Sequence, residues 1–294
     1  MPQDYCPFCP GSGKVPEDYD LLIYPNDFPS LSIPPPRPVI KSGELYRVEE
    51  ARGICDVVLY TPDHNASLSK LPLPHIERLV LLWRDRFREL SNREEIKYVF
   101  IFENKGEVIG VTIPHPHGQI YAFPFIPPRV KTELRSSREY MEEKGRCLFC
   151  TILAEEGKSR ERVVFENESF LAFIPFYARY PYEVHVFSKP HLQSLEDFLE
   201  EQIRDLARIL KLVVMKYDNL FGFPFPYMMV MHQAPTDGED YSYYHFHIEF
   251  YPPHRSKEKI KYPASCEFGA GTFINDTCAE EKAKELRETP PWDM

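Results

Sequence analysis

The sequence lacks two features that would direct the protein to a membrane or out of the cell. Among its 294 residues, no stretch approaches the roughly 20 consecutive apolar residues that a membrane-spanning helix requires. The first residues, Met1 to Cys6, contain neither the basic segment nor the apolar segment of a secretory signal. We therefore expect a cytoplasmic protein with no membrane partner.

Positive charge is also scarce. Lys and Arg number 35 against 45 Asp and Glu, which gives a formal net charge of −10. Because binding to a nucleic-acid polymer needs a basic surface, this balance argues against such a partner. It does not exclude a small phosphorylated ligand, which needs only a few local hydrogen-bond donors.

The cysteines do not suit a disulfide framework. There are seven, an odd number, and four of them form two Cys-x-x-Cys pairs. In a reducing compartment this spacing is more typical of metal ligands than of disulfides.

The two Cys-x-x-Cys pairs belong to an internal repeat. In each half the pair is followed by a histidine after a β-like run and then by a His-x-His motif. The interval from His64 to His115 is 51 residues (115 − 64), and the interval from His191 to His245 is 54 (245 − 191). An amphipathic helix follows the first histidine of each half, at about residues 74–90 and 194–220.

The repeat predicts an α+β fold. Strands are expected at residues 55–60, 98–102, 183–187 and 227–231, together with the two His-x-His segments. Each half is then a unit of meander-like, mostly antiparallel strands packed against one long helix. We expect an N-terminal unit at 1–128 and a C-terminal unit at 129–294, joined in one pseudo-symmetric sheet assembly.

The repeated cysteines and histidines predict two zinc sites, because Cys₂His₂ is a standard ligand set for zinc. The alternative is that these residues are ordinary buried thiols and imidazoles. The first predicted set is Cys6, Cys9, His64 and His115, and the second is Cys147, Cys150, His191 and His245.

The segment His115-Pro116-His117-Gly118-Gln119 has the features of a reactive centre. If the segment is a strand, His115, His117 and Gln119 project to the same side. A zinc ion on His115 would hold His117 on a rigid support, as a nucleophilic imidazole requires. Gln119 can donate a hydrogen bond to phosphoryl oxygens but cannot shuttle a proton, which favours a covalent phosphoramidate over rapid hydrolysis.

Several longer motifs resemble the galactose-1-phosphate uridylyltransferase family, a branch of the histidine-triad superfamily. The resemblance covers nearly the whole chain, and it implies two histidine-triad-like units of which only the first is catalytic. The motifs that carry it are Tyr24-Pro25-Asn26-Asp27-Phe28, Phe102-Glu103-Asn104-Lys105-Gly106, Pro114 to Gln119, Lys216-Tyr217-Asp218-Asn219-Leu220-Phe221 and Phe250-Tyr251-Pro252-Pro253.

The resemblance implies a ping-pong reaction in a zinc-containing homodimer. UDP-glucose is attacked by His117, glucose 1-phosphate leaves, and galactose 1-phosphate then takes the uridylyl group. Gln119 is expected to contact the transferred phosphoryl group, with Asn104 and Thr112 nearby. The other substrate-binding residues implied by the family are Asn26, Asp27 and Phe28 at the nucleotide, and Lys261 and Glu267 at the sugar phosphate across the dimer interface.

The sequence departs from the family pattern in the groups that contact the substrate. Relatives often carry paired arginines before the first Cys-x-x-Cys, and Arg37, Arg52 and Lys105 are the residues considered as their replacement. Cys266 and Phe273 stand at positions where the family has a sugar-contacting tyrosine and glutamine.

A second departure concerns the second metal, which some relatives bind with one glutamate and three histidines. The matching residues here have a carboxylate in place of one histidine. We prefer the repeated Cys₂His₂ set, and the alternative set is Glu156, His232, His247 and Glu249.

Two other functions remain open at this point. One is a related nucleotidyl transferase or phosphorylase that uses another nucleotide sugar, such as ADP-glucose. The other is a non-enzymatic, zinc-stabilised nucleotide-binding module, which would bind nucleotide without forming a covalent adduct.

Overall fold

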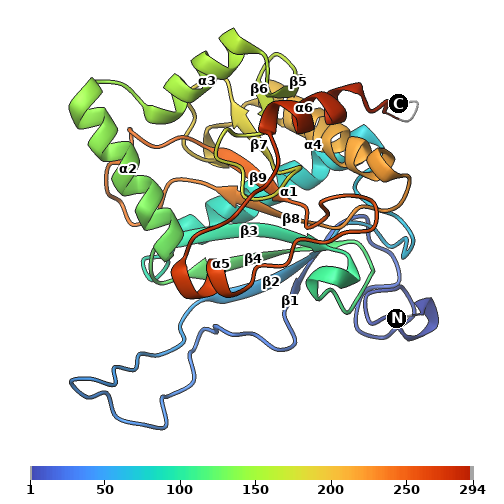
Figure 1. The fold of residues 1–294 in the computed structure, drawn as a ribbon. Helices are drawn as coiled ribbons and strands as arrows, with labels where there is room; N and C mark the ends of the chain where they lie inside the picture. The colour runs from blue at the N-terminus through green and yellow to red at the C-terminus, as the bar shows by residue number, and fades with distance from the viewer. Residues whose placement is uncertain (1, 292–294) are drawn as a thin grey trace.

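A single nine-stranded sheet organises the computed structural model, which describes residues 2–291 (Figure 1). The strand order is β1-β2-β4-β3-β8-β9-β7-β6-β5. The strands are β1 (Leu22–Pro25), β2 (Ile54–Leu59), β3 (Tyr98–Lys105), β4 (His117–Phe123), β5 (Val163–Glu166), β6 (Phe170–Phe173), β7 (Val184–Ser188), β8 (Tyr227–His232) and β9 (His247–Tyr251). No helix within the described range has the length and apolar character needed to cross a membrane.

The sheet confirms the prediction of two repeated, antiparallel units. Strands β2, β4 and β3 of the first half correspond to β7, β9 and β8 of the second, and every named strand pair is antiparallel. The two halves meet where β3 pairs with β8, with Ile101 opposite Met231. Hydrogen bonding therefore continues across the whole sheet from one half to the other.

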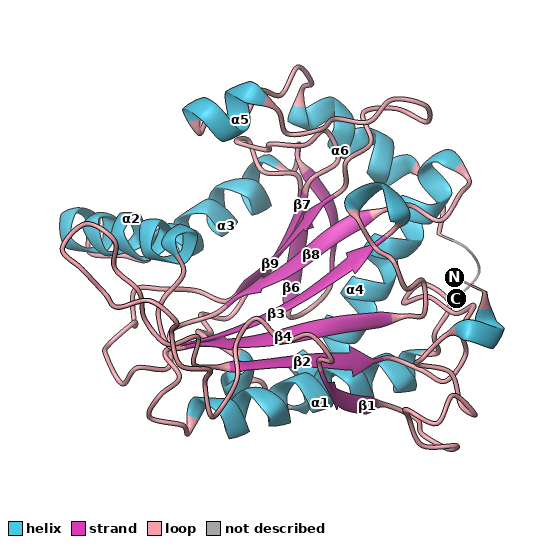
Figure 2. Cartoon of the chain, turned by 90° about the horizontal axis from the view of Figure 1, so that it is seen from below, coloured by secondary structure: helices cyan, strands magenta, loops and turns pink. Residues whose placement is uncertain are grey.

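Two long helices pack against one face of the sheet. Helix α1 (Leu73–Ser91) buries an apolar stripe that includes Trp83, and α4 (Glu200–Phe221) does the same with a face that includes Leu210. Both helices share one hydrophobic core with the inward side chains of the central strands. Figure 2 shows both helices beside the sheet. The core forms because a stripe of apolar residues at helical spacing must be removed from water.

The second long helix begins later than the sequence suggested. Ser194 and Asp197 form the expected capping box, but it closes a short 3₁₀ helix, η3 (Leu195–Asp197), and α4 starts only at Glu200. The hydrogen bonds from the Ser194 amide to Asp197 and from the Glu196 amide to Ser194 satisfy that short turn. The capping signal was therefore real, and the prediction was wrong about the helix that it caps.

The opposite face of the sheet is covered differently in the two halves. Over the second half lie α2 (Pro128–Lys144) and α3 (Leu148–Ser159), which contribute Val130, Leu134 and Phe149 to a second core. Over the first half lie the N-terminal loops, beginning with the short helix η1 (Gln3–Tyr5). The remaining helices are η2 (Glu107–Ile109), α5 (Ser265–Ala270) and α6 (Ala279–Glu288).

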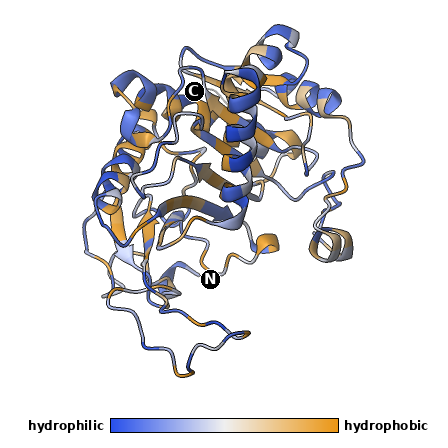
Figure 3. Cartoon of the chain, turned by 90° about the vertical axis from the view of Figure 1, so that its left-hand side faces the viewer, coloured by the Kyte–Doolittle hydropathy of each residue, from blue (hydrophilic) through white to orange (hydrophobic). Residues whose placement is uncertain are grey.

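A long loop between β1 and β2 projects from the body of the protein, at the bottom of Figures 1 and 3. In Figure 3 hydrophilic colour predominates along this loop, whereas the hydrophobic colour gathers in the sheet. Val39, Leu45 and Tyr46 are apolar exceptions with exposed fractions of 101%, 83% and 80%.

Candidate active site and metal centres

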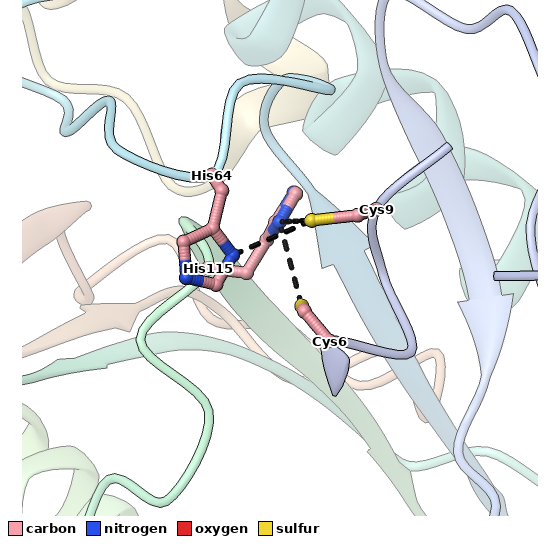
Figure 4. Close-up of side chains that lie close together, drawn as sticks. All are labelled: Cys6, Cys9, His64 and His115. Carbon is pink, nitrogen blue, oxygen red and sulfur yellow. Dashed lines mark hydrogen bonds between the residues drawn. The ribbon is translucent and has the colours of Figure 1, made fainter. Parts of the chain in front are cut away.

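The four residues of the first predicted zinc set lie together beside the start of β4. Cys6 and Cys9 come from the N-terminal loop, His64 from the loop after β2, and His115 from the segment before β4 (Figure 4). Their potential ligand atoms are all within 4.8 Å of one another, and all four residues are buried. The N-terminal loop is thereby placed against the reactive segment.

The geometry of this group suits a tetrahedral zinc ion. Usual zinc–sulfur and zinc–nitrogen bonds put sulfur and nitrogen about 3.6 Å apart in a tetrahedron. The distances are 3.4 Å from Cys9 Sγ to His64 Nδ1, 3.5 Å from Cys9 Sγ to His115 Nδ1 and 3.8 Å from Cys6 Sγ to His115 Nδ1. The Nε2–H of His115 donates to the Thr61 carbonyl at 2.7 Å, which leaves Nδ1 free for the metal.

Burial also decides the protonation of this group when no metal is bound. It raises the pKa of the Cys9 thiol to about 11 and lowers the pKa of His115 to about 4. Without a metal the thiol therefore keeps its proton at neutral pH. A divalent ion that replaces this proton would find a neutral imidazole already in the ligating tautomer.

The second predicted zinc set has the same construction in the second half. Cys150 Sγ lies 3.2 Å from His191 Nδ1 and 3.5 Å from His245 Nδ1, and Cys147 completes the group. The Nε2 atoms again face carbonyl oxygens, that of Ser188 at 2.7 Å for His245 and that of Ser242 at 3.0 Å for His191. This group differs from the first in that His191 is exposed and Cys150 only half-buried.

His117 is the first residue of β4 and is held in one tautomer by its neighbour. Its Nδ1–H donates to the carbonyl oxygen of His115 at 2.7 Å, so that Nε2 carries the free lone pair. Burial lowers the pKa of His117, which keeps the imidazole neutral and nucleophilic near pH 7. The strand includes His117 but not His115, which corrects the expectation that both histidines belong to it.

A cavity of about 450 Å³ opens beside His117. It is bounded by the loop that carries His64, the end of β3 and the turn before His115. Among the described residues, the lysines or arginines in its wall are Lys70 and Lys105, and Lys105 Nζ is 2.8 Å from Asp218 Oδ1. Arg37 and Arg52 do not line this cavity.

Gln119 and Asn104 lie on the outward face of the sheet near His117. Strand alternation puts Gln119 on the same side as His117, and Gln119 is opposite Phe102 in the β3–β4 register. Asn104 lines the cavity, whereas Gln119 and the exposed Thr112 do not.

The predicted nucleotide-binding segment follows β1 on the same side of the molecule. Asn26 accepts the amide of Phe28 at 2.9 Å, Asp27 accepts Lys14 Nζ and the hydroxyl of Tyr24, both at 2.7 Å, and Phe28 is 90% exposed. None of the three lines the cavity beside His117.

Lys261 and Glu267 form an ion pair with each other, 3.2 Å apart, next to α5. They do not line the cavity beside His117 of the same chain. Cys266 and Phe273 belong to the same region, and the ring of Phe273 lies 6.4 Å from that of Tyr180 with the two planes inclined by 56°.

A third group of potential ligands is buried in the second half, and it corrects the alternative metal set. It consists of Glu133, His232, His247 and Glu249, with potential ligand atoms within 4.8 Å of one another. Glu156 does not take part, because it is paired with Arg162 at 2.9 Å. Glu133 comes from α2, whose place against β8 and β9 was not visible in the sequence.

The positive charge of Arg129 already lies beside the third group. The guanidinium of Arg129 is 3.0 Å from Glu249 and 3.1 Å from Glu133, and His232 Nδ1 is 2.7 Å from Glu133. Although burial opposes it, the charges of His185 and His232 lower the pKa of Glu249 to about 2, so this carboxylate is ionised at neutral pH.

The structure brings to the reactive segment two aromatic residues to which the sequence assigned no individual role. Phe8, between Cys6 and Cys9, packs edge-on against His117 with 5.6 Å between ring centroids, and Tyr24 packs on Phe8 at 6.0 Å. The hydroxyl of Tyr19 donates to the Phe8 carbonyl at 2.7 Å. The position of Phe8 inside the Cys-x-x-Cys pair was the one available signal, since the cysteines on either side of it lie against His115.

Comparison with known proteins agrees with this architecture. Residues 2–127 match the model of the galactose-1-phosphate uridyl transferase N-terminal domain, and residues 133–291 match that of the C-terminal domain. Among solved structures, one described as a uridylyltransferase has a TM-score of 0.92 at 40% identity and covers 98% of this chain and 92% of its own. An ADP-glucose phosphorylase from Arabidopsis thaliana superposes with a TM-score of 0.83 at 27% identity, over 99% of this chain and 92% of its own. The fold is thus shared with a uridylyltransferase and with an ADP-glucose phosphorylase.

Curated relatives narrow the assignment. The galactose-1-phosphate uridylyltransferase of Thermotoga maritima is 50% identical over 285 residues, covering 97% of this chain and 89% of its own length. The enzyme of the same name from Haemophilus influenzae is 37% identical over 96% of this chain and 82% of its own length. The chain belongs to the galactose-1-phosphate uridylyltransferase family.

Proposed function

We propose that the protein transfers UMP from UDP-glucose to galactose 1-phosphate through a uridylyl group carried on His117. The observation that supports this most directly is the hydrogen bond from His117 Nδ1–H to the His115 carbonyl. It leaves Nε2 as the attacking atom and fixes the direction of its lone pair. The family membership and the 50% identity to a galactose-1-phosphate uridylyltransferase agree with this activity.

The reaction has two balanced steps. His117 Nε2 forms a bond to the α-phosphorus of UDP-glucose, and the bond from that phosphorus to the bridging oxygen breaks to release glucose 1-phosphate. The imidazole then carries a positive charge, which the carbonyl of His115 stabilises through the proton on Nδ1. An oxygen of galactose 1-phosphate next attacks phosphorus, the phosphorus–nitrogen bond breaks, and His117 returns to its neutral form.

Proton transfer is not needed in either step, because a phosphate group is both the leaving group and the acceptor. The protein therefore contributes positioning and charge stabilisation. We assign to Gln119 a hydrogen bond from its amide to the transferred phosphoryl group. Because an amide cannot act as a general base at neutral pH, Gln119 does not activate water against the uridylyl intermediate.

The remaining substrate contacts are proposed from the family motifs. Asn104 lines the cavity beside His117, and Thr112 lies in the loop leading to it, so both are assigned to the phosphates. Lys105 is favoured over Arg37 and Arg52 as a source of positive charge, since Lys105 lines that cavity and the two arginines do not. The segment Asn26 to Phe28 is assigned to the nucleotide.

We further propose that the two Cys₂His₂ groups bind zinc. Sulfur–nitrogen distances of 3.2–3.8 Å and carbonyl partners for the distal ring nitrogens support both sites. A bound zinc ion supplies a fixed cross-link between the loops of each half. In the first half this cross-link holds His115, and through its carbonyl the ring of His117.

We also propose a cytoplasmic homodimer. Exposed Phe28, Tyr46 and Phe268 are large apolar side chains that a second copy would cover, and Lys261 and Glu267 lie outside the cavity of their own chain. Sedimentation equilibrium should give about twice the chain mass of 34.6 kDa. A monomer at micromolar concentration would contradict the dimer.

The transfer is tested by intact-protein mass spectrometry after brief incubation with UDP-glucose near pH 8. We expect an acid-labile adduct of UMP mass and one equivalent of released glucose 1-phosphate. Addition of galactose 1-phosphate should remove the adduct and yield UDP-galactose. Absence of the adduct in an active, zinc-loaded preparation would refute the covalent mechanism.

ADP-glucose is the competing donor, because a structurally similar relative is an ADP-glucose phosphorylase. The same experiment with ADP-glucose decides between them. We expect little AMP adduct, since the similarity to galactose-1-phosphate uridylyltransferases is higher, at 50% identity against 27%. Preferential formation of an AMP adduct would transfer the assignment to the phosphorylase.

A further inference from the structure

Gly118 lies between the two reactive side chains, and space rather than backbone conformation explains its presence. A Cβ atom at Gly118 would come within 2.3 Å of the hydroxyl oxygen of Tyr60. Gly118 is not among the glycines with positive φ, so another residue could adopt its backbone conformation. The missing side chain therefore makes room for the end of Tyr60 beneath the segment that carries His117 and Gln119.

Tyr60 reaches this position from the end of β2. Its backbone amide donates to the Pro116 carbonyl at 3.0 Å, and the register places Leu59 opposite His117. The ring therefore extends along the helix-covered face of the sheet, behind the reactive strand. It is completely enclosed there and packs edge-on against Trp83 with 5.9 Å between the ring centroids.

A carboxyl group meets the Tyr60 hydroxyl on the far side of Gly118. Glu103 of β3 is 6% exposed, and its Oε1 accepts the hydroxyl of Tyr227 at 2.9 Å. Its other oxygen, Oε2, and the Tyr60 hydroxyl are buried neighbours, but neither has a partner of good hydrogen-bonding geometry within the described residues. The three side chains form a polar row, Tyr60–Glu103–Tyr227, across strands of both halves.

Two charged groups influence Glu103. Lys105 on the same strand favours its ionised form, whereas Asp218 of α4 opposes it, and the two tyrosines are the nearest hydrogen-bonding groups. His75 of α1 faces the backbone carbonyl of Tyr60 at 2.6 Å, and its other ring nitrogen lies 3.2 Å from Asp20. Burial is the largest effect and raises the pKa of Glu103 to about 7.

A buried carboxyl group of this kind is not explained by a contribution to the stability of the fold. Removing a carboxylate from water costs free energy, and an apolar side chain of similar size would fill the space with no polar atom left unpaired. The row does, however, touch the backbone at Gly118 from behind. A polar contact there can determine where His117 and Gln119 project on the other face.

We propose that Glu103 is a positioning residue of the uridylyl-transfer site, which holds Tyr60 against Gly118 and thereby fixes the backbone between His117 and Gln119. This inference rests on the proposed function, in which His117 is the nucleophile. Glu103 also lies in the wall of the cavity beside His117, but its Oε1 already accepts the hydroxyl of Tyr227. We therefore assign its effect to Tyr60 and not to a contact with the reacting phosphorus. Its loss should therefore slow the chemical step while leaving substrate affinity nearly unchanged.

The test is a single-turnover measurement of uridylyl-enzyme formation in Glu103→Met, Glu103→Gln and Tyr60→Phe. We expect Glu103→Met and Tyr60→Phe to lower the rate constant at saturating UDP-glucose on the order of tenfold, because small misplacements of reacting groups are costly. The half-saturating concentration should stay within about twofold. Glu103→Gln, which offers one acceptor and one donor like the protonated carboxyl group, should be faster than Glu103→Met and close to the wild type measured at a pH where Glu103 is protonated.

The double variant Tyr60→Phe with Glu103→Met should be no slower than Glu103→Met alone, because the two residues act as one unit. The control is Tyr182→Phe, which removes the hydroxyl of another buried tyrosine bonded to a glutamate, Glu285, at 2.6 Å. This control should lower thermal stability by a similar amount and leave the rate unchanged. Equal rates in Glu103→Met and the wild type, additive losses in the double variant, or a loss confined to affinity would overturn the proposal.

The pH profile separates positioning from general destabilisation. In the wild type the rate constant should fall as the pH drops through about 7, because Glu103 gains a proton and loses an acceptor oxygen. This bend should be absent in Glu103→Gln, and its persistence there would contradict the assignment. The wild-type adduct is measured in parallel. If the proposed function is wrong, no adduct forms at all; if only this inference is wrong, the adduct forms but the variants do not slow its formation.

Discussion

The two His-x-His segments have the same backbone frame and different chemical environments. In both halves the second histidine donates Nδ1–H to the carbonyl of the first, at 2.7 Å for His117 and 3.0 Å for His247. The third position is Gln119 in the first half and Glu249 in the second. The hydrogen-bond frame is therefore common to both, and the residue at the third position separates them.

The surroundings of His247 are unsuitable for a phosphate. Its Nε2 faces the carboxylates of Glu249 at 3.7 Å and Glu133 at 4.0 Å, and Arg129 is already committed to both of these groups. A phosphoryl group would have to displace these interactions and approach an ionised carboxylate. The first half has a neutral amide at the equivalent place, which is why we assign catalysis to it alone.

The largest difference between the two halves is expected when the second histidine of each motif is replaced by asparagine, one at a time. We expect His117→Asn to abolish the UMP adduct and to lower turnover by at least about ten-thousandfold, as loss of a nucleophile does in other enzymes. His247→Asn should keep the adduct at one equivalent per chain. The measurement is adduct mass with steady-state turnover, and an adduct on His117→Asn would move the nucleophile elsewhere.

A smaller effect is expected from making the third positions alike. Gln119→Glu should slow adduct formation by about a hundredfold, because it replaces a hydrogen-bond donor with a negative charge beside the phosphoryl oxygens. Glu249→Gln should leave the rate within about twofold, although it removes a partner of Arg129. If both substitutions slowed the chemistry equally, the two halves would have to share the site.

The smallest difference is expected between the two Cys₂His₂ groups. We expect both to bind one zinc ion and to differ mainly in how accessible that ion is to solvent. Replacing Cys6 and Cys9 with serine should remove one zinc and most of the activity, since His115 loses its support. Replacing Cys147 and Cys150 should also remove one zinc but spare more activity.

Elemental analysis should find about two zincs in the parent protein, and a mild chelator should remove the second-half zinc first, because His191 is exposed. Three metals per chain would instead implicate the group of Glu133, His232, His247 and Glu249.

Much of the fold could be predicted from the sequence because the repeat is local and regular. The spacing of the cysteines and histidines, together with periodic apolar residues, predicted helix α1 and the strands β2, β3, β4, β7, β8 and β9, but not β1, β5 and β6. The start of α4 was misplaced because the capping signal at Ser194 belongs to a separate short turn. The division of the chain at residues 128 and 129 stays a prediction.

The site was only partly accessible to sequence reasoning. Residues close in the chain or in the repeat, such as His115 and His117, could be grouped, whereas Glu133 could not, because only the packing of α2 brings it to β8 and β9. Tyr60 and Glu103 escaped notice for a similar reason. Their meeting behind Gly118 depends on the register of three strands from distant segments.

The pairing of β3 with β8 has a consequence for how the chain acquires its structure. Residues 98–105 can complete their hydrogen bonds only after residues 227–232 have been synthesised, so the first half exposes a sheet edge during translation. A truncated first half would retain that edge and could satisfy it by pairing with another copy. The continuous sheet that unites the finished protein is therefore also its point of greatest risk of misassembly.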